Sequence, residues 1–166
     1  MSARATSIAV VGIGNSLLTD DGAGIHALER FAQGNTHDDV TCIDGGTVGL
    51  ALLDRLCGLD GLIAIDAMKL GFPPGTVTVL RNAEMDTHLK NQKGSVHEVG
   101  LSDLLDALRL RDELPAHRAL IGIEPQSLDW GTAPTAAVAA ALQRAEQCTH
   151  GLIREWRASA SLENAA

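Results

Sequence analysis

The sequence predicts an α/β protein with one mostly parallel, twisted β-sheet of about five strands and helices on both faces. Its 166 residues are the usual size of one domain, and 45% of them are hydrophobic, enough for a buried core. Short apolar runs alternate with amphipathic stretches of helical periodicity, the order expected of a parallel sheet. No repeat, linker or change of composition divides the chain. We therefore expect a single domain over residues 1–166.

Five apolar or β-branched runs predict the strands. The first, residues 7–13, is continuously apolar and ends near glycine, which is typical of a strand buried on both faces. Asp44 directly follows the second run and Asp66 directly follows the third. The other four runs are residues 40–43, 62–65, 76–80 and 119–123.

Amphipathic periodicity predicts four helices. Ser102 is an expected N-cap of the third, and Pro134 lies in the first turn of the fourth. We expect the residues from about 158 onward to be frayed. The four helices are predicted at residues 23–32, 49–56, 101–110 and 134–145.

Charge and composition exclude several classes of partner. The net charge of −8 repels nucleic-acid backbones and anionic lipid surfaces, and aromatic residues make up only 2% of the chain. No segment approaches the ~20 apolar residues of a membrane helix. The three cysteines lack C-x-x-C spacing, as in reduced proteins. We expect a cytoplasmic protein with neither nucleic-acid nor membrane partners.

Acidic residues follow three of the predicted strands. Asp21, Asp44 and Asp66 are expected at the same sheet edge, because ligands of parallel sheets bind at the carboxyl ends of the strands. His97 is predicted in a loop just before the helix at 101–110, from which it can reach this edge. Two carboxylates from this edge together with the His97 imidazole would suit a divalent transition metal such as zinc or nickel, with positions left open for substrate.

Structural explanations compete with these functional ones. Asp20 and Asp21 precede a helix, so one can cap it; we assign this structural role to Asp20 and leave both roles open for Asp21. An Asx-turn explains Asp44 as well as a functional role does. Gly12 and Gly14 begin a dinucleotide-binding pattern, but Leu17 occupies the third glycine position, which favours a simple tight turn.

Five blocks of sequence together resemble the [NiFe]-hydrogenase maturation endopeptidases. They occur in the family's order and extend the resemblance from about residue 8 to 145. The blocks are GIGNSLLTDDG at 12–22, DGGTVG at 44–49, IAIDA at 63–67, His97 with GLSD at 100–103, and IGIEP at 121–125.

The resemblance implies an endopeptidase that removes the C-terminal extension of a [NiFe]-hydrogenase large-subunit precursor. In this family cleavage follows nickel insertion, and the precursor's own nickel serves as the recognition signal. The resemblance assigns nickel contacts to Asp21, Asp66 and His97, with glutamate in place of Asp21 in many relatives. Asp44 matches another acidic position of the family, to which the resemblance assigns a part in hydrolysis.

The residues leave the mechanism open. Asp21 or Asp66 could serve as general base, or the metal could lower the pKa of a bound water, so the peptidase is either aspartic-type or metal-assisted. The backbone N–H groups of residues 45–47 are candidate oxyanion donors.

Three other functions remain as alternatives at this stage. A non-catalytic, nickel-sensing chaperone of hydrogenase assembly would bind the precursor without shortening it. A nucleotide-binding enzyme would bind nucleotide, and an unrelated metallopeptidase would cut generic peptides.

Overall fold

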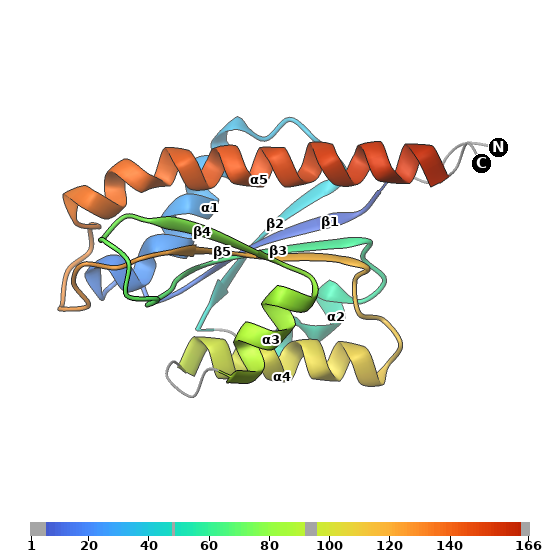
Figure 1. The fold of residues 1–166 in the computed structure, drawn as a ribbon, viewed down its shortest axis with the longest axis horizontal. Coiled ribbons are helices and arrows are strands. Elements are labelled where there is room, and N and C mark those ends of the chain that lie inside the picture. The colour runs from blue at the N-terminus through green and yellow to red at the C-terminus, as the bar shows by residue number, and fades with distance from the viewer. Residues whose placement is uncertain (1–5, 48, 92–95, 164–166) are drawn as a thin grey trace.

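The computed structural model describes residues 6–47, 49–91 and 96–163, whose strands form one five-stranded sheet (Figure 1). The strands are β1 (Ile8–Ile13), β2 (Val40–Gly46), β3 (Gly61–Ala67), β4 (Val77–Arg81) and β5 (His117–Ile123). Their order across the sheet is β2-β1-β3-β5-β4, and all neighbours are parallel except β4, which runs antiparallel to β5. The predicted α/β class with a mostly parallel sheet is confirmed.

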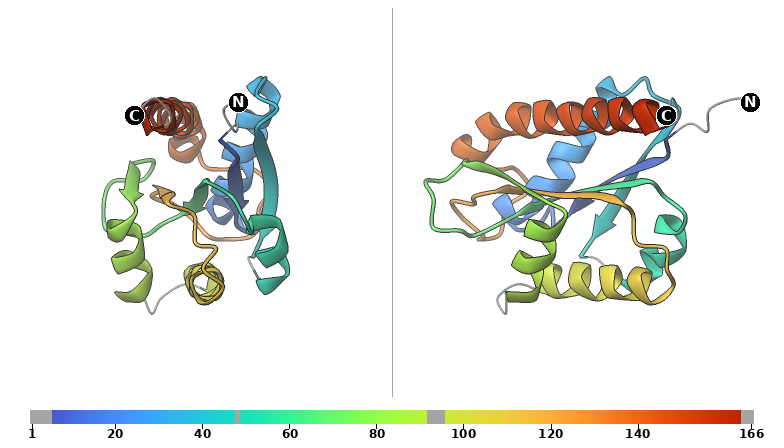
Figure 2. Two further views of the ribbon diagram at one scale, coloured as in Figure 1. Left: turned by 90° about the vertical axis from the view of Figure 1, so that its right-hand side faces the viewer. Right: turned by 45° about the vertical axis from the view of Figure 1, so that its right-hand side comes forward.

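Helices cover both faces of the sheet. The α-helices are α1 (Ala23–Gly34), α2 (Leu53–Leu56), α3 (Ala83–Asn91), α4 (Val96–Leu110) and α5 (Ala136–Glu163), with two 3₁₀ turns, η1 (Thr19–Gly22) and η2 (Leu50–Leu52). In both views of Figure 2, α5 lies on the opposite side of the sheet from α4. The chain thus forms three layers, with the sheet in the middle.

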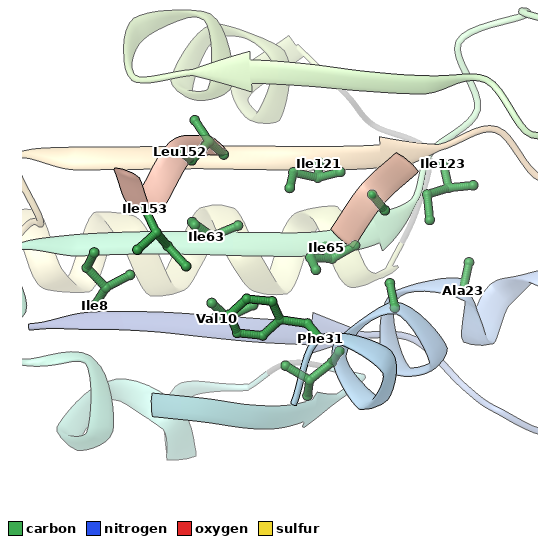
Figure 3. Packing of buried hydrophobic residues seen from close by; sticks show 14 of the residues in the cluster. Ile8, Val10, Ala23, Phe31, Ile63, Ile65, Ile121, Ile123, Leu152 and Ile153 are labelled. Carbon is green, nitrogen blue, oxygen red and sulfur yellow. The ribbon is translucent and has the colours of Figure 1, made fainter. Parts of the chain in front are cut away.

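Alternating strand residues supply the cores of the two faces. Ile8 and Val10 of β1 pack with α1 and α5, in the cluster that Figure 3 shows around Phe31. Ala9 and Val11 point the other way and pack with α2, α3 and α4. All six residues of β1 are buried, which confirms a strand covered on both faces.

The carboxyl ends of β1, β2, β3 and β5 meet at one edge of the sheet, on the left in Figure 1. The connections after these strands lie there, and α4 begins there. We call this edge of the sheet the carboxyl edge.

The helices differ from the sequence predictions in their lengths. The helix expected at 134–145 continues to Glu163 and so includes residues 158–163, where we expected a frayed end. Its apolar periodicity persists through Leu152, Ile153 and Trp156, which are buried. Helix α3 was not predicted, because Met85 and Leu89 are the sole buried apolar residues in its described turns.

Two further boundaries were misplaced. Residues 49–56 form a 3₁₀ turn followed by a single α-helical turn rather than one helix. Strand β2 does not stop at Ile43 but runs through Asp44 to Gly46, because β1 continues to pair with it as far as Ile13 across an irregularity in register.

In the described part of the chain no helix combines the length and the hydropathy needed to cross a membrane. Helix α5 has 28 residues, but it carries charged residues along its length.

Candidate active site at the carboxyl edge of the sheet

Asp66 is the buried acid of this edge. It is the sixth residue of β3, and it shares a face with Leu62 and Ala64, which pack on the side of α4. Its side chain is only 4% exposed. Burial raises the pKa of the Asp66 carboxyl to about 6, although the nearby His97 imidazole opposes this shift. Its Oδ1 accepts no hydrogen bond from the described residues.

His97 lies in the first turn of α4, not in a loop as the sequence analysis expected. The buried residues Leu101, Leu104, Leu105 and Leu108 mark the face of α4 that packs on the sheet. His97 stands four residues before Leu101 and therefore on the same face. This spacing was a signal, overlooked in the sequence, that the helix begins one turn earlier. For the same reason Ser102 is inside the helix and not its cap.

The His97 ring lies between two carboxylates. Its Nε2 is 3.6 Å from Asp21 Oδ2, and its Nδ1 is 3.5 Å from Asp66 Oδ1. The imidazole is 12% exposed and the Asp21 side chain 19%. The structure thus brings together the three residues predicted as metal ligands, from three separate elements.

Asp21 reaches this group because two glycines allow close packing. The backbone N–H of Asn15 donates to Asp21 Oδ2 at 3.0 Å and holds the carboxylate in place. Gly14 has φ 139°, and a Cβ there would lie 1.9 Å from the Asp21 carbonyl oxygen. A Cβ on Gly24 would lie 2.1 Å from the Ile65 carbonyl oxygen. Gly14 therefore serves a tight turn, as expected, and Gly24 serves a close helix–strand approach that the sequence did not predict.

Asp44 does not join the other three residues. Its register places it beside Gly12, and it shares the α1 side of the sheet with Cys42, whereas Asp66 faces α4. The Asp44 side chain is exposed, and its Oδ1 accepts a hydrogen bond from the Gly46 N–H at 2.9 Å. This is the Asx-turn that the sequence allowed, and it occupies one of the three candidate oxyanion donors.

Asp20 has a structural role different from the expected helix cap. No side-chain hydrogen bond caps α1, and Asp20 is fully buried. Its carboxylate accepts hydrogen bonds from the backbone N–H groups of Gln126, Ser127 and Thr135 and from the Thr135 hydroxyl, at 2.7–3.0 Å. These bonds hold the pKa of Asp20 below its ordinary value, although burial opposes them. The partners lie more than 100 residues away, so no local sequence pattern indicates them.

Glu124 is a second buried anchor, for which the sequence predicted no role. Its carboxylate oxygens accept hydrogen bonds from the Leu70 N–H at 2.8 Å and the Gly71 N–H at 3.2 Å. Glu124 thereby fixes the β3–β4 connection directly after Asp66.

The site combines the partly exposed Asp21 carboxylate, the buried Asp66 carboxylate and the His97 imidazole. Groups of this kind suit cation binding and proton transfer. In the described ranges, no three histidine, cysteine or acidic side chains are already arranged to hold a metal ion by themselves. Both His97 nitrogens face carboxylates instead. Chemically, the fold and site define an α/β protein with a compact carboxylate–imidazole centre at the carboxyl edge.

Comparisons with known proteins place this arrangement in a family. The family model described as hydrogenase maturation protease matches residues 25–151. The hydrogenase 2 maturation protease of Escherichia coli K12 is 37% identical over 150 residues, covering 89% of this chain and 91% of that protein. A hydrogenase expression/formation protein of Rhizobium leguminosarum is 36% identical over 92% of this chain and 76% of its own length.

Solved structures agree with the sequence matches. The hydrogenase maturating endopeptidase HybD from E. coli superposes with a TM-score of 0.84 at 36% identity, covering 90% of this chain and 93% of that chain. The [NiFe] hydrogenase maturation protease HybD from Thermococcus kodakarensis gives a TM-score of 0.77 at 28% identity, covering 88% and 98%. The chain belongs to the hydrogenase maturation protease family and is an endopeptidase. The chaperone and nucleotide-enzyme alternatives are set aside.

Proposed function

We propose that this endopeptidase removes the C-terminal extension of a [NiFe]-hydrogenase large-subunit precursor after nickel has been inserted into that precursor. Asp21, Asp66 and His97 contact the nickel that the substrate carries. The observation that supports the proposal best is the grouping of these three side chains around one imidazole at the carboxyl edge. Family membership supports the substrate, since its relatives are maturation proteases of hydrogenases.

The donor atoms suit a nickel ion that arrives with the substrate. Carboxylate oxygens and an imidazole nitrogen are ligands that divalent transition metals accept. Asp66 Oδ1 is buried and accepts no hydrogen bond from the described residues, so it retains lone pairs for a cation. Both ring nitrogens of His97 face carboxylates, so the ring has to turn from one of them to contact the ion. A precursor without nickel would bring no cation to offset the negative charges of Asp21 and Asp66.

Hydrolysis requires a base that water can reach. The Asp21 side chain is 19% exposed and that of Asp66 only 4%, so Asp21 is the better placed to accept a proton from an attacking water. Asp66, on the buried side of the ring, orients His97. Asp44 faces away from this group, and its part in hydrolysis stays a prediction that its own variant can test.

Intact mass spectrometry of a large-subunit precursor, with and without nickel, tests the proposal. The unaltered protein is expected to release a C-terminal peptide from the nickel-loaded precursor alone. Asp66→Asn removes the buried charge and is expected to slow release at least 100-fold. Asp38→Asn, an exposed acid before β2, is the matched control and should cleave normally. Asp44→Asn, run in parallel, decides whether that acid takes part.

Two results would contradict the proposal. Equal cleavage of the nickel-free precursor would remove the role of nickel in recognition. Full activity of Asp66→Asn would remove the proposed site.

A further inference from the structure

Exposed apolar side chains concentrate at the carboxyl edge. Eight large apolar side chains are exposed in the described part of the chain, and six of them lie in connections after strands or in the first turn of α4. These six are Leu17, Leu50, Phe72, Val99, Leu128 and Trp130; the other two, Leu110 and Leu162, lie near the far ends of α4 and α5. The candidate active site thus lies at the edge of the sheet where exposed apolar side chains gather, in a chain with a net charge of −8.

Three of the six come from two connections that lie side by side. Leu17 is in the β1–η1 connection, and Leu128 and Trp130 are in the β5–α5 connection. The Gly131 N–H donates to the Leu17 carbonyl at 2.9 Å, and the Thr19 N–H donates to the Gly131 carbonyl at 2.8 Å. We call Leu17, Leu128 and Trp130 the loop patch. Figure 1 shows the two connections meeting beside the start of α1.

The loop patch is held rigidly although it is exposed. The Thr19 hydroxyl donates to the Asp129 carbonyl at 2.6 Å, and the buried Asp20 carboxylate binds the start and end of the β5–α5 connection. Trp130 is nevertheless 82% exposed. An exposed tryptophan on an ordered backbone loses little conformational entropy when a partner covers it, and tryptophan is enriched among residues that dominate binding energy.

The scarcity of charged residues around the loop patch indicates what it binds. Residues 15–19 and 126–133 carry one charged side chain, Asp129, in a chain of which 20% is charged. The Asp129 carboxylate already accepts a hydrogen bond from the Ser127 hydroxyl at 3.0 Å. The patch therefore suits an apolar partner, and it adjoins η1, the turn that carries Asp21.

We propose that the loop patch binds an apolar stretch of the precursor polypeptide next to its scissile bond, with Trp130 as the main anchor. This inference rests on the proposed function, since it takes the precursor as the partner. Leu17 lies four residues before Asp21, and the connection that carries Trp130 is hydrogen-bonded to the same segment through Thr19 and Asp20. A chain seated on Trp130 would therefore pass close to the catalytic centre. The loop patch contributes to binding of the precursor and not to the chemical step.

Steady-state cleavage of the nickel-loaded precursor by the full-length protein tests the inference. Trp130→Ala is expected to raise KM about tenfold or more with kcat nearly unchanged, and the Kd for the precursor should rise in parallel. Leu110, at the end of α4, is an apolar residue of similar exposure. Leu110→Ala is therefore the matched control and should leave KM and Kd unaltered. Circular dichroism should show both variants folded, and Trp130→Phe should recover much of the binding.

The outcomes separate the two proposals. Cleavage by Trp130→Ala at unchanged KM and Kd overturns the loop patch and leaves the peptidase proposal intact. An unaltered protein that binds the precursor without shortening it, with binding lost in Trp130→Ala, supports the patch and overturns the proposed hydrolysis. Neither binding nor cleavage by the unaltered protein overturns both.

Discussion

Asp20 and Asp21 are adjacent in η1 but have different environments and therefore different functions. Asp21 is partly exposed and faces His97, whereas Asp20 is fully buried beneath the β5–α5 connection. A buried carboxylate is stable only where donors surround it, and Asp20 accepts four hydrogen bonds. Asp20 thus positions the backbone on which Asp21 and Trp130 stand.

Replacing Asp20 by asparagine should therefore destabilise the protein. The amide would turn an NH₂ group toward backbone donors, so hydrogen bonds are lost and a donor is left buried. We expect the free energy of unfolding to fall by about 2–4 kcal/mol, measured by urea denaturation. Asp129→Asn, an exposed acid in the connection that Asp20 holds, should change it by less than about 0.5 kcal/mol. Equal stability of the two variants would contradict the anchoring role.

At the scale of elements, the two long helices have separate functions. Helix α4 begins at the carboxyl edge and carries His97 there in its first turn. Helix α5 has no residue in the candidate site and covers the opposite face along its 28 residues. Trp156 of α5 stacks on His117 with ring centroids 5.5 Å apart and covers Gly61, where a Cβ would lie 2.8 Å from the indole. The second half of α5 is therefore part of the core.

Removal of the Trp156 side chain should lower the free energy of unfolding without altering the chemistry of the candidate active site. Trp156→Ala leaves a large cavity between α5 and the starts of β3 and β5, and we expect a loss of about 3–5 kcal/mol in urea denaturation. Leu162→Ala, which is exposed on the last turn of α5, is the control and should be nearly neutral. A loss below about 1 kcal/mol for Trp156→Ala would show that α5 is peripheral beyond residue 145.

At the scale of the whole molecule, an ion pair joins the sheet to the α3–α4 layer. Arg118 of β5 donates to both carboxylate oxygens of Asp86 in α3, at 2.9 and 2.6 Å, and Arg109 of α4 lies 3.5 Å away. Asp86 and Arg118 are each less than a fifth exposed. The Arg118 guanidinium holds the pKa of the Asp86 carboxyl below its ordinary value near 3.8.

This pair makes part of the stability dependent on pH. The unfolded carboxyl takes up a proton more readily than the folded one, so the contribution of Asp86 is complete above its unfolded pKa and disappears as pH falls through the lower folded pKa. Asp86→Asn should cost about 1–3 kcal/mol near pH 7, and the difference from the unaltered protein should shrink as the pH falls from 7 to values below 3.8.

Urea denaturation across that range is the measurement. Asp106→Asn, whose exposed carboxylate also pairs with Arg109, serves as the control and should change little at any pH. A difference for Asp86→Asn that is constant with pH would contradict the electrostatic origin.

The sequence by itself determined the presence of five strands, the mostly parallel character of their sheet and the acids near the carboxyl ends of β2 and β3. Continuous apolar runs such as residues 7–13 leave few alternatives to a buried strand, and Asp66 follows such a run. Leu17 in place of a third glycine favoured a simple tight turn after the first strand, and Gly14 lies in such a turn. The ordered blocks around Asp21, Asp66 and His97 were sufficient to indicate the family.

The tertiary structure alone decided which of these residues meet. His97 lies between Asp21 and Asp66 because α4 starts one turn early and crosses the sheet edge, whereas Asp44 falls on the opposite face. Asp20 and the loop patch depend on contacts between segments more than 100 residues apart. Sequence periodicity reports local conformation and burial, but convergence of distant side chains depends on strand register and helix packing, which no local pattern contains.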